Sequence, residues 1–499
     1  MRTAVPRGGR LLPAAAGGLA LFAFAAMGLM IAAAAAYVLL TNTHPRGFFL
    51  LYACVPALCL AGAAVLLPAE RLGRRAFLIL LFTAALVLKG TAALTVTPRL
   101  ESDFYLLHYA AEQLAQGNNI LNDTSYFQLW PYQSFFVAVL AGVMKLFGAS
   151  PVVFRLMNAL LSALTNLLVY ALARRFASER GARLAGLLFL LYPGTFFLIP
   201  LLTNQHLSEC LLLAAFWACT APAERLPGRL WRGGAGGVLL ALSNAVRPMG
   251  LVAVLALCAC MVFQLMEVWE KRSGWALLLS GLCTLAAYFL CGALISGLVV
   301  WTGLNRLGLT NQAPEWKFVL GLNTQSLGRY SDADAAAVFG PGVADWRGEL
   351  ERLLEERLTI SLPALLRLMA HKIRIMWGGF EDASWVLTAS YLAELEGRGL
   401  AAAALTGTGV LQRLCSGCWI SMNLMNAGAA LSALRRRERP QGVRLLLMLT
   451  ALAYFCAHLF IEIQIRYRST MTVLLIILAA AGFDWAAGLF RRRRAGERE

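Results

Sequence analysis

The sequence predicts an all-α polytopic membrane protein, and three observations support this fold class. Hydrophobic residues make up 59% of the 499-residue chain and charged residues only 14%, with a mean hydropathy of +0.65. A soluble domain of this composition lacks the polar residues needed to cover its surface. Apolar runs of about 20 residues, the length that a helix needs to cross the hydrocarbon core, recur along the chain. Short arginine clusters separate many of these runs, as in cytoplasmic loops.

The arginine clusters fix the predicted topology. They lie at residues 2–10, 71–75, 174–183, 225–232, 271–272, 435–439 and 491–494. With the N-terminus inside, a bundle of about 12 transmembrane helices places all of them in the cytoplasm. The predicted spans are residues 16–40, 47–67, 75–96, 152–173, 183–203, 206–221, 233–246, 249–267, 275–300, 409–434, 442–461 and 470–490. The spans at 206–221 and 233–246 are short for complete crossings, so a re-entrant pair is an alternative.

Two long segments between these spans divide the chain. An N-terminal transmembrane module, residues 1–300, contains an outer loop at 98–150, and a C-terminal module covers 409–499. Between the modules, residues 301–408 form an extracytoplasmic loop domain with a helix near 345–358 and a basic amphipathic run at 362–377, which suits a lipid interface. In the outer loop, Asp103 precedes a helical stretch that Gly117 ends. We expect the apolar stretch at 133–148 to lie along the outer surface.

Composition also excludes several classes of function. The formal charge of +17 arises from the loop clusters, so it follows membrane topology and does not indicate nucleic-acid binding. Nine of the eleven cysteines lie singly inside predicted spans, where small residues pack. Cys415 and Cys418 have a CxxC spacing, but they have no second pair and no neighbouring histidine, so we expect packing there as well. We expect no metal and no cofactor.

The predicted topology brings several polar residues to the side that carries Asp103. They come from three short outward loops and are Asn204, His206, Glu209, Arg247, Arg466, Tyr467 and Arg468. Basic residues are unusual at the outer end of a helix, which favours a binding role for Arg466 and Arg468. Arginines, amides and a carboxylate on one face suit the recognition of an anionic lipid phosphate.

The order of these features resembles that of a known family. An Asp after an early helix, a long outer loop with the aromatic-Pro pair Trp130-Pro131, a polar loop two helices later and a late Arg466-Tyr467 are similar to the GT-C fold polyprenyl-phosphate-dependent integral-membrane glycosyltransferases. The similarity is greatest to the branch of protein O-mannosyltransferases and aminoarabinose transferases. Residues 244–250, Asn-Ala-Val-Arg-Pro-Met-Gly, also resemble a motif of the mannosyltransferases that build glycolipid anchors.

The resemblance implies a role for individual residues. Asp103 matches the acid of the first loop, which acts in that family as the general base on the acceptor. Trp130-Pro131 stands where relatives often have His-Pro-Pro or Pro-Pro, so a role of that histidine does not carry over. Glu209 or Asn204 takes the place of a second acid. The expected function is inverting transfer of a sugar from a polyprenyl-phosphate donor to an extracytoplasmic glycan, lipid or protein, in a bacterial cytoplasmic membrane.

The residues themselves leave alternatives open. Asp103 could cap a helix that begins at Phe104, Arg247 could be an interfacial anchor, and Glu462 could pair with Arg466. His206 could be a loop residue that only forms hydrogen bonds, and Glu381-Asp382 could be a solvated turn or a divalent-cation site.

A second class of function also fits about twelve helices and a phosphate site. A transporter or flippase of a lipid-linked saccharide would need both features, but it predicts internal repeats and ionisable residues near the midplane. No segment is repeated, and Lys89 and Lys145 are nearly the only charges within apolar stretches. The polar residues instead share one interface, which favours an enzyme.

Overall fold

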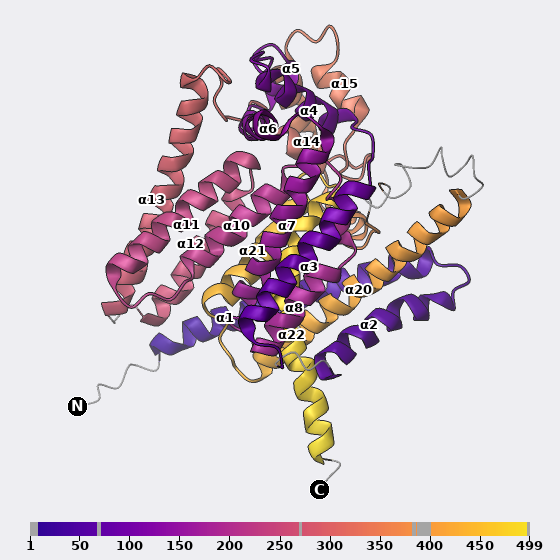
Figure 1. Ribbon diagram of the computed structural model, residues 1–499, viewed down its shortest axis with the longest axis vertical. Coiled ribbons are helices and arrows are strands. Elements are labelled where there is room, and N and C mark those ends of the chain that lie inside the picture. The colour runs from indigo at the N-terminus through magenta and orange to yellow at the C-terminus, as the bar shows by residue number, and fades with distance from the viewer. Residues whose placement is uncertain (1–7, 67–70, 269–271, 382–385, 387–400, 497–499) are drawn as a thin grey trace.

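The computed structural model describes residues 8–66, 71–268, 272–381, 386 and 401–496, and its regular elements are all helices. The predicted all-α fold is therefore confirmed for these residues (Figure 1). Eight helices are long and apolar enough to cross a membrane. They lie at Ala14–Thr41, Phe48–Leu66, Arg74–Thr95, Pro151–Ala173, Gly250–Val268, Gly274–Trp301, Gly442–Phe460 and Ile465–Phe490. The protein is an integral, multi-pass membrane protein.

Helices lie at each predicted span, although part of the span at 183–203 is irregular. The long helices are α1 (Gly8–Thr41), α2 (Phe48–Leu66), α3 (Arg74–Thr95), α7 (Pro151–Ala173), α8 (Glu179–Leu191), α10 (Gln205–Cys219), α11 (Leu226–Val246), α12 (Gly250–Val268), α13 (Arg272–Trp301), α20 (Ala401–Arg435), α21 (Gly442–Phe460) and α22 (Arg468–Gly496). Helices α1 and α2 pack on α20, α3 packs on α7, and α11 packs between α10 and α13. Of these helices, α8 and α10 have only 13 and 15 residues, too few for a full crossing.

The span predicted at 183–203 is broken. Helix α8 ends at Leu191 because Pro193, which lacks an N–H, follows, and the short α9 (Gly194–Phe197) begins next to it. Residues 198–204 then run without regular structure. Asn158, which is buried in α7, donates hydrogen bonds to the carbonyls of Ile199 (3.1 Å) and Leu201 (2.9 Å). Irregular backbone is stable at this depth because protein groups satisfy it.

The loops gather at one end of the bundle, which we call the loop end (Figure 1). It contains α4 (Ser102–Ala115), α5 (Ser125–Leu129), α6 (Gln133–Phe147), α14 (Trp316–Gly321), α15 (Asp332–Phe339) and α16 (Trp346–Leu358). Helix α4 ends as predicted, with Gly117 at φ +95°. Helix α6 is too short to be one of the eight spans, and it packs on α4 through Leu107 and Phe136.

Described residues of several arginine clusters lie at the opposite end of the bundle. Arg183 donates a hydrogen bond to the Leu72 carbonyl (2.7 Å), Ser178 binds Asp484, and Arg439 lies 3.6 Å from Glu267. We call this the basic end. The loops and the basic clusters therefore lie at opposite ends of the bundle, as in the predicted topology.

The run predicted for a lipid interface is partly buried in the protein. It forms α17 (Leu362–Lys372) and a π-helical turn, η1 (Ile373–Trp377). Lys372 is 1% exposed. Its ammonium donates hydrogen bonds to the carbonyls of Gly321 (2.9 Å), Leu459 (2.9 Å) and Ile461 (2.8 Å), which compensate for its burial. Trp377 packs in the main core, so the end of this run contacts protein.

Candidate active site

Asp103 lies in the first turn of α4, at the loop end of the bundle. The helix begins at Ser102, two residues earlier than predicted, and Ser102 has a φ of +50°. A non-glycine residue in this region is strained, and such strain is common at functional sites. The residue at the N-cap position is Glu101. The carboxylate of Asp103 forms no hydrogen bond or ion pair with any described residue, so it is not occupied by capping.

Two tyrosines of the outer loop lie within electrostatic reach of Asp103. Burial and then the charge of Asp103 raise the pKa of the Tyr126 phenol well above its usual value. Burial also raises the pKa of Tyr132, with a smaller contribution from Asp103. Gln133 donates a hydrogen bond to the Tyr126 hydroxyl (3.2 Å). Both phenols therefore stay neutral and can donate hydrogen bonds beside the carboxylate.

Arg247 and Arg466 flank the ring of Tyr467. Their guanidinium carbons lie 5.2 Å and 5.7 Å from its centroid. Arg247 donates to the Asn204 side-chain oxygen (3.1 Å), and Arg466 donates to the Gln464 side-chain oxygen (2.5 Å). Neither arginine pairs with a described carboxylate. Arg466 also lies over the ring of Phe104, at 5.3 Å, which places it beside Asp103.

Arg468 has different surroundings, although only one residue separates it from Arg466. It is 2% exposed and forms an ion pair with Glu381 (2.6 Å). It also donates to the Gly379 carbonyl (2.9 Å) and lies over the ring of Trp419. Since these partners occupy its guanidinium, the phosphate role predicted from the sequence fits Arg466 better than Arg468. Glu381 is the buried partner of an arginine rather than part of a solvated turn. Asp382 lies outside the described residues.

The turn that carries Arg466 and Tyr467 is η3 (Ile465–Tyr467), and its backbone is held from several sides. Gln205 donates to the Arg466 carbonyl (2.9 Å) and Tyr454 donates to the Tyr467 carbonyl (2.6 Å). Glu462 does not pair with Arg466 as the sequence allowed, because Lys317 of α14 binds it at 2.5 Å. Gln464 connects the two groups by donating to Glu462 (2.8 Å) and accepting from Arg466.

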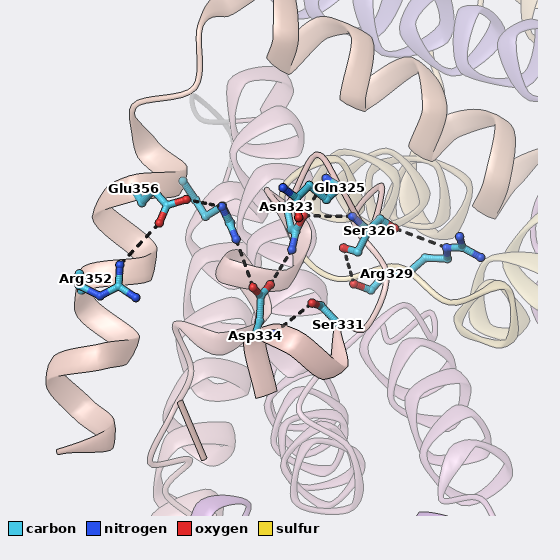
Figure 2. A network of polar contacts seen from close by, with 9 residues as sticks. Asn323, Gln325, Ser326, Arg329, Ser331, Asp334, Arg352 and Glu356 are labelled. Carbon is cyan, nitrogen blue, oxygen red and sulfur yellow. Dashed lines mark hydrogen bonds and ion pairs between the residues drawn. The ribbon is translucent and has the colours of Figure 1, made fainter. Parts of the chain in front are cut away.

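The loop domain also binds the segment just before this turn, through α14 and the loop at residues 321–331. The amides of Glu462 and Ile463 donate to the carbonyls of Lys317 and Gly328, both at 2.8 Å. Figure 2 shows what fixes this loop: Asn323 donates to Asp334 (2.6 Å) and accepts from the amides of Gln325 and Ser326. Asp334 in turn pairs with Arg357 of α16 (3.2 Å). A buried carboxylate thus links α15, α16 and the loop.

A cavity of about 540 Å³ opens on the inner side of Arg466. Its lining combines apolar residues with polar ones, among them Thr165, Tyr192, His206, Glu209, Arg466 and Ser469. Glu209 is buried, and its Oε1 accepts hydrogen bonds from Ser469 (2.6 Å) and Thr470 (2.9 Å). The Nε2 atom of buried His206 has no hydrogen-bond partner among the described residues.

The structure thus groups the residues predicted from the sequence around Arg466. Arg466 contacts the rings of Tyr467 and Phe104, the residue next to Asp103. Arg247 contacts Tyr467 and Asn204, and His206 and Glu209 line the cavity. Sequence reasoning missed Lys317, Tyr126 and Tyr132, which only the fold brings here. It also gave no role to Lys89, whose charge within an apolar run was the available signal. Among the described residues, no group of three His, Cys, Asp or Glu side chains is placed to hold a metal ion.

Comparison with known proteins supports one branch of the predicted resemblance. Residues 134–293 match the family model described as dolichyl-phosphate-mannose-protein mannosyltransferase. The resemblance to membrane glycosyltransferases is confirmed. The matched segment runs from α6 to α13, so it contains Asn204, His206, Glu209 and Arg247 but neither Asp103 nor Arg466.

The other comparisons add little. No curated protein matches the chain significantly. Among solved structures, it is similar to the apo oligosaccharyltransferase of Archaeoglobus fulgidus, with 13% sequence identity and a TM-score of 0.31. That similarity covers 80% of this chain and 56% of the other, so the chain spans little more than half the length of that protein. A similarity this weak carries no conclusion about the activity.

Proposed function

We propose that the protein is a glycosyltransferase that moves a sugar from a polyprenyl-phosphate donor to an acceptor at the loop end of the bundle. The observation that carries this proposal is the pair of arginines on Tyr467. Two guanidinium groups are held in place by neutral amides and aromatic rings, and no described carboxylate neutralises them. Such a pair can bind an external anion, and a phosphate can accept two parallel hydrogen bonds from one guanidinium group.

Asp103 supplies the second part of the chemistry. An acceptor hydroxyl must lose its proton as its oxygen attacks the anomeric carbon of the sugar, and a carboxylate within hydrogen-bond reach can take that proton. The bond between the anomeric carbon and the phosphate oxygen breaks, and its electron pair stays on the phosphate. Arg247 and Arg466 would stabilise the growing negative charge. Attack from the face opposite the phosphate inverts the anomeric configuration.

The arrangement also suits a substrate that is partly in the membrane. Arg466 lies where the loop end meets the bundle, and it contacts both Phe104 of the outer loop and the inner cavity. A polyprenyl tail would remain among the membrane helices while the phosphate meets the arginines. The acceptor, an envelope glycan, a lipid or a protein, would approach from the side of Asp103.

Replacing Asp103 tests the proposed base. With a radiolabelled polyprenyl-phosphate sugar in native membranes, Asp103→Asn should slow the release of polyprenyl phosphate by at least ~100-fold, the lower end of a general base's contribution. Donor binding should not change. Asp123→Asn, which alters an exposed carboxylate of the same loop, is the matched control and should keep the wild-type rate.

Two outcomes would contradict this role. Asp103→Ser retains a side chain suited to a helix start but cannot accept the proton at neutral pH, so a near-normal rate in that variant would reduce Asp103 to a structural residue. A flippase would show a different pattern, because Asp103→Asn would leave lipid movement across the membrane unchanged and no wild-type sample would release free polyprenyl phosphate.

A further inference from the structure

A second cavity lies in the half of the bundle that is remote from the candidate active site. It has a volume of about 560 Å³ and is lined by residues of α10, α12, α13 and α21. Thr220 follows the last turn of α10, Gln264 lies near the end of α12, and Leu446 lies near the start of α21. A basic cluster adjoins each of these helix ends in the sequence, so the cavity lies toward the basic end (Figure 1). The proposed transfer chemistry uses none of its lining residues.

Most residues that line this cavity are apolar. They include Leu257, Met261, Leu277, Leu285 and Leu446. The hydroxyl groups among the lining residues are already used, because Ser280 donates to the Arg229 carbonyl (3.1 Å) and Thr284 donates to the Ser280 carbonyl (2.9 Å). A polar ligand would find few partners here. An alkyl chain would instead pack against the apolar side chains.

Two arginines lie at the polar edge of the cavity. Arg175, in the turn after α7, donates a hydrogen bond to the hydroxyl of Thr220, one of the lining residues. Burial and then the charge of Arg232 on α11 lower the pKa of Arg175 to about 10, so Arg175 stays charged at neutral pH beside a second cation. Its guanidinium carbon lies 5.3 Å from the ring centroid of the exposed Trp217. Tryptophan is typical of membrane interfaces, so these groups suit the headgroup region of a lipid.

No described carboxylate neutralises the two arginines. The neighbouring Arg174 pairs with Glu179 (2.7 Å). The described hydrogen-bond partners of Arg175 and Arg232 are instead a threonine hydroxyl and the Pro222 carbonyl. Like charges that lie close together in partly buried surroundings repel each other. A phosphate, which can accept hydrogen bonds from both guanidinium groups, would remove this repulsion.

We infer that this cavity binds an anionic phospholipid from the leaflet at the basic end. The phosphate accepts hydrogen bonds from Arg175 and Arg232, and one acyl chain occupies the cavity. Charge complementarity selects an anionic headgroup, because a zwitterionic lipid brings its own cation to the two arginines. Basic pockets between transmembrane helices bind such headgroups in other membrane proteins. The inference is independent of the proposed function, whose phosphate site on Arg466 lies at the loop end.

Native mass spectrometry of the full-length protein in detergent tests this site. Phosphatidylglycerol and phosphatidylcholine with identical acyl chains are added in equal amounts, and the phosphatidylglycerol adduct should be about tenfold more abundant. Arg175→Gln should lower phosphatidylglycerol binding about tenfold, as expected for the loss of a hydrogen bond to a charged group. Phosphatidylcholine binding should not change. Arg225→Gln, which removes an exposed arginine of the same cluster, is the matched control and should bind both lipids like the wild type.

A second comparison separates a lipid from a free phosphate and uses the wild-type protein. Glycerol phosphate carries the anion without acyl chains, so a large excess should not displace phosphatidylglycerol. Dihexanoyl phosphatidylglycerol should displace the long-chain lipid only weakly, because each missing methylene removes apolar contact. Long-chain phosphatidylglycerol should also raise the melting temperature of the wild type more than that of Arg175→Gln, since a ligand of the folded state stabilises it.

Several results would overturn the inference. Equal adducts of the two lipids, or equal losses in Arg175→Gln and Arg225→Gln, would mean that the basic end attracts lipids without a defined site. Displacement by glycerol phosphate would mean that the apolar cavity takes no part in binding. Arg466→Gln should leave phosphatidylglycerol binding unchanged, and a loss of that binding would place the lipid at the proposed donor site. None of these results decides the proposed function, which the Asp103 variants test separately.

Discussion

At the scale of single residues, Arg466 and Arg468 show how neighbours in the sequence acquire different roles. Both were expected at the phosphate, because basic residues are unusual at the outer end of a helix. Arg466 remains available, with an amide and two rings as its partners. Arg468 is turned into the protein, where Glu381 and a backbone carbonyl bind it. One arginine is therefore placed for a ligand and the other for structure.

Substituting the two arginines should produce different defects. Arg466→Gln should weaken polyprenyl-phosphate binding while leaving thermal stability near that of the wild type, and Arg466→Lys should recover only part of the affinity because a point charge lacks the bidentate fork. Arg468→Gln leaves Glu381 buried without its partner and should cost about 3–5 kcal/mol of stability. Lipid titration and thermal denaturation measure the two effects. Equal loss of affinity in both variants with unchanged stability would contradict this division.

The sequence indicated which polar residues lie on one side of the bundle, but it did not indicate their contacts. Asp103 and Arg466 could be found because membrane topology places each of them at a helix end on one side. The burial of Arg468 could not be predicted, since its partner Glu381 is 87 residues away. The same holds for Glu462, whose partner Lys317 is 145 residues distant. The lengths of apolar runs and the positions of basic clusters indicate how deep a residue lies in the membrane. They do not indicate which side chains contact one another.

At the scale of elements, the loop domain holds the backbone of residues 461–467, the segment that ends in the turn carrying Arg466. Its amides bond to the carbonyls of Lys317 and Gly328, so the position of Arg466 is linked to α14 and to the loop at 321–331. That loop is fixed by Asp334, through Asn323 on one side and Arg357 on the other (Figure 2). The loop domain thus supports the turn that carries the candidate phosphate site.

Removing the Asp334 carboxylate should loosen this support. Asp334→Ala leaves Arg357 and Asn323 without their common acceptor and should destabilise the loop domain by about 3 kcal/mol, as for breaking a buried ion pair. Limited proteolysis should then cut faster within residues 321–358, and the affinity for polyprenyl phosphate should fall modestly. Asp345→Asn is a matched control, since asparagine still caps α16. Unchanged proteolysis in Asp334→Ala would show that other contacts hold the loop.

At the scale of the whole molecule, the candidate site residues and the arginine clusters lie at opposite ends of the bundle. The loop end carries Asp103, Arg247 and Arg466, and the basic end carries the arginine clusters. The sequence predicted this separation because apolar runs and arginine clusters alternate along the whole chain. It did not predict the break in 183–203, where Pro193 ends α8 and the side chain of Asn158 satisfies the backbone that follows.

The orientation of the bundle decides where the proposed reaction takes place, and charge parity predicts that the loop end is outside the cytoplasm. A cysteine introduced at the exposed Asn118 or Glu355 should react with a membrane-impermeant maleimide in intact cells, because both positions lie at the loop end. A cysteine at the exposed Arg435, at the basic end, should react only after the cells are permeabilised. All eleven native cysteines are free, so labelling of the unmodified chain sets the background. The reverse pattern would place Asp103 and the arginines in the cytoplasm, and it would then require a donor presented in the inner leaflet.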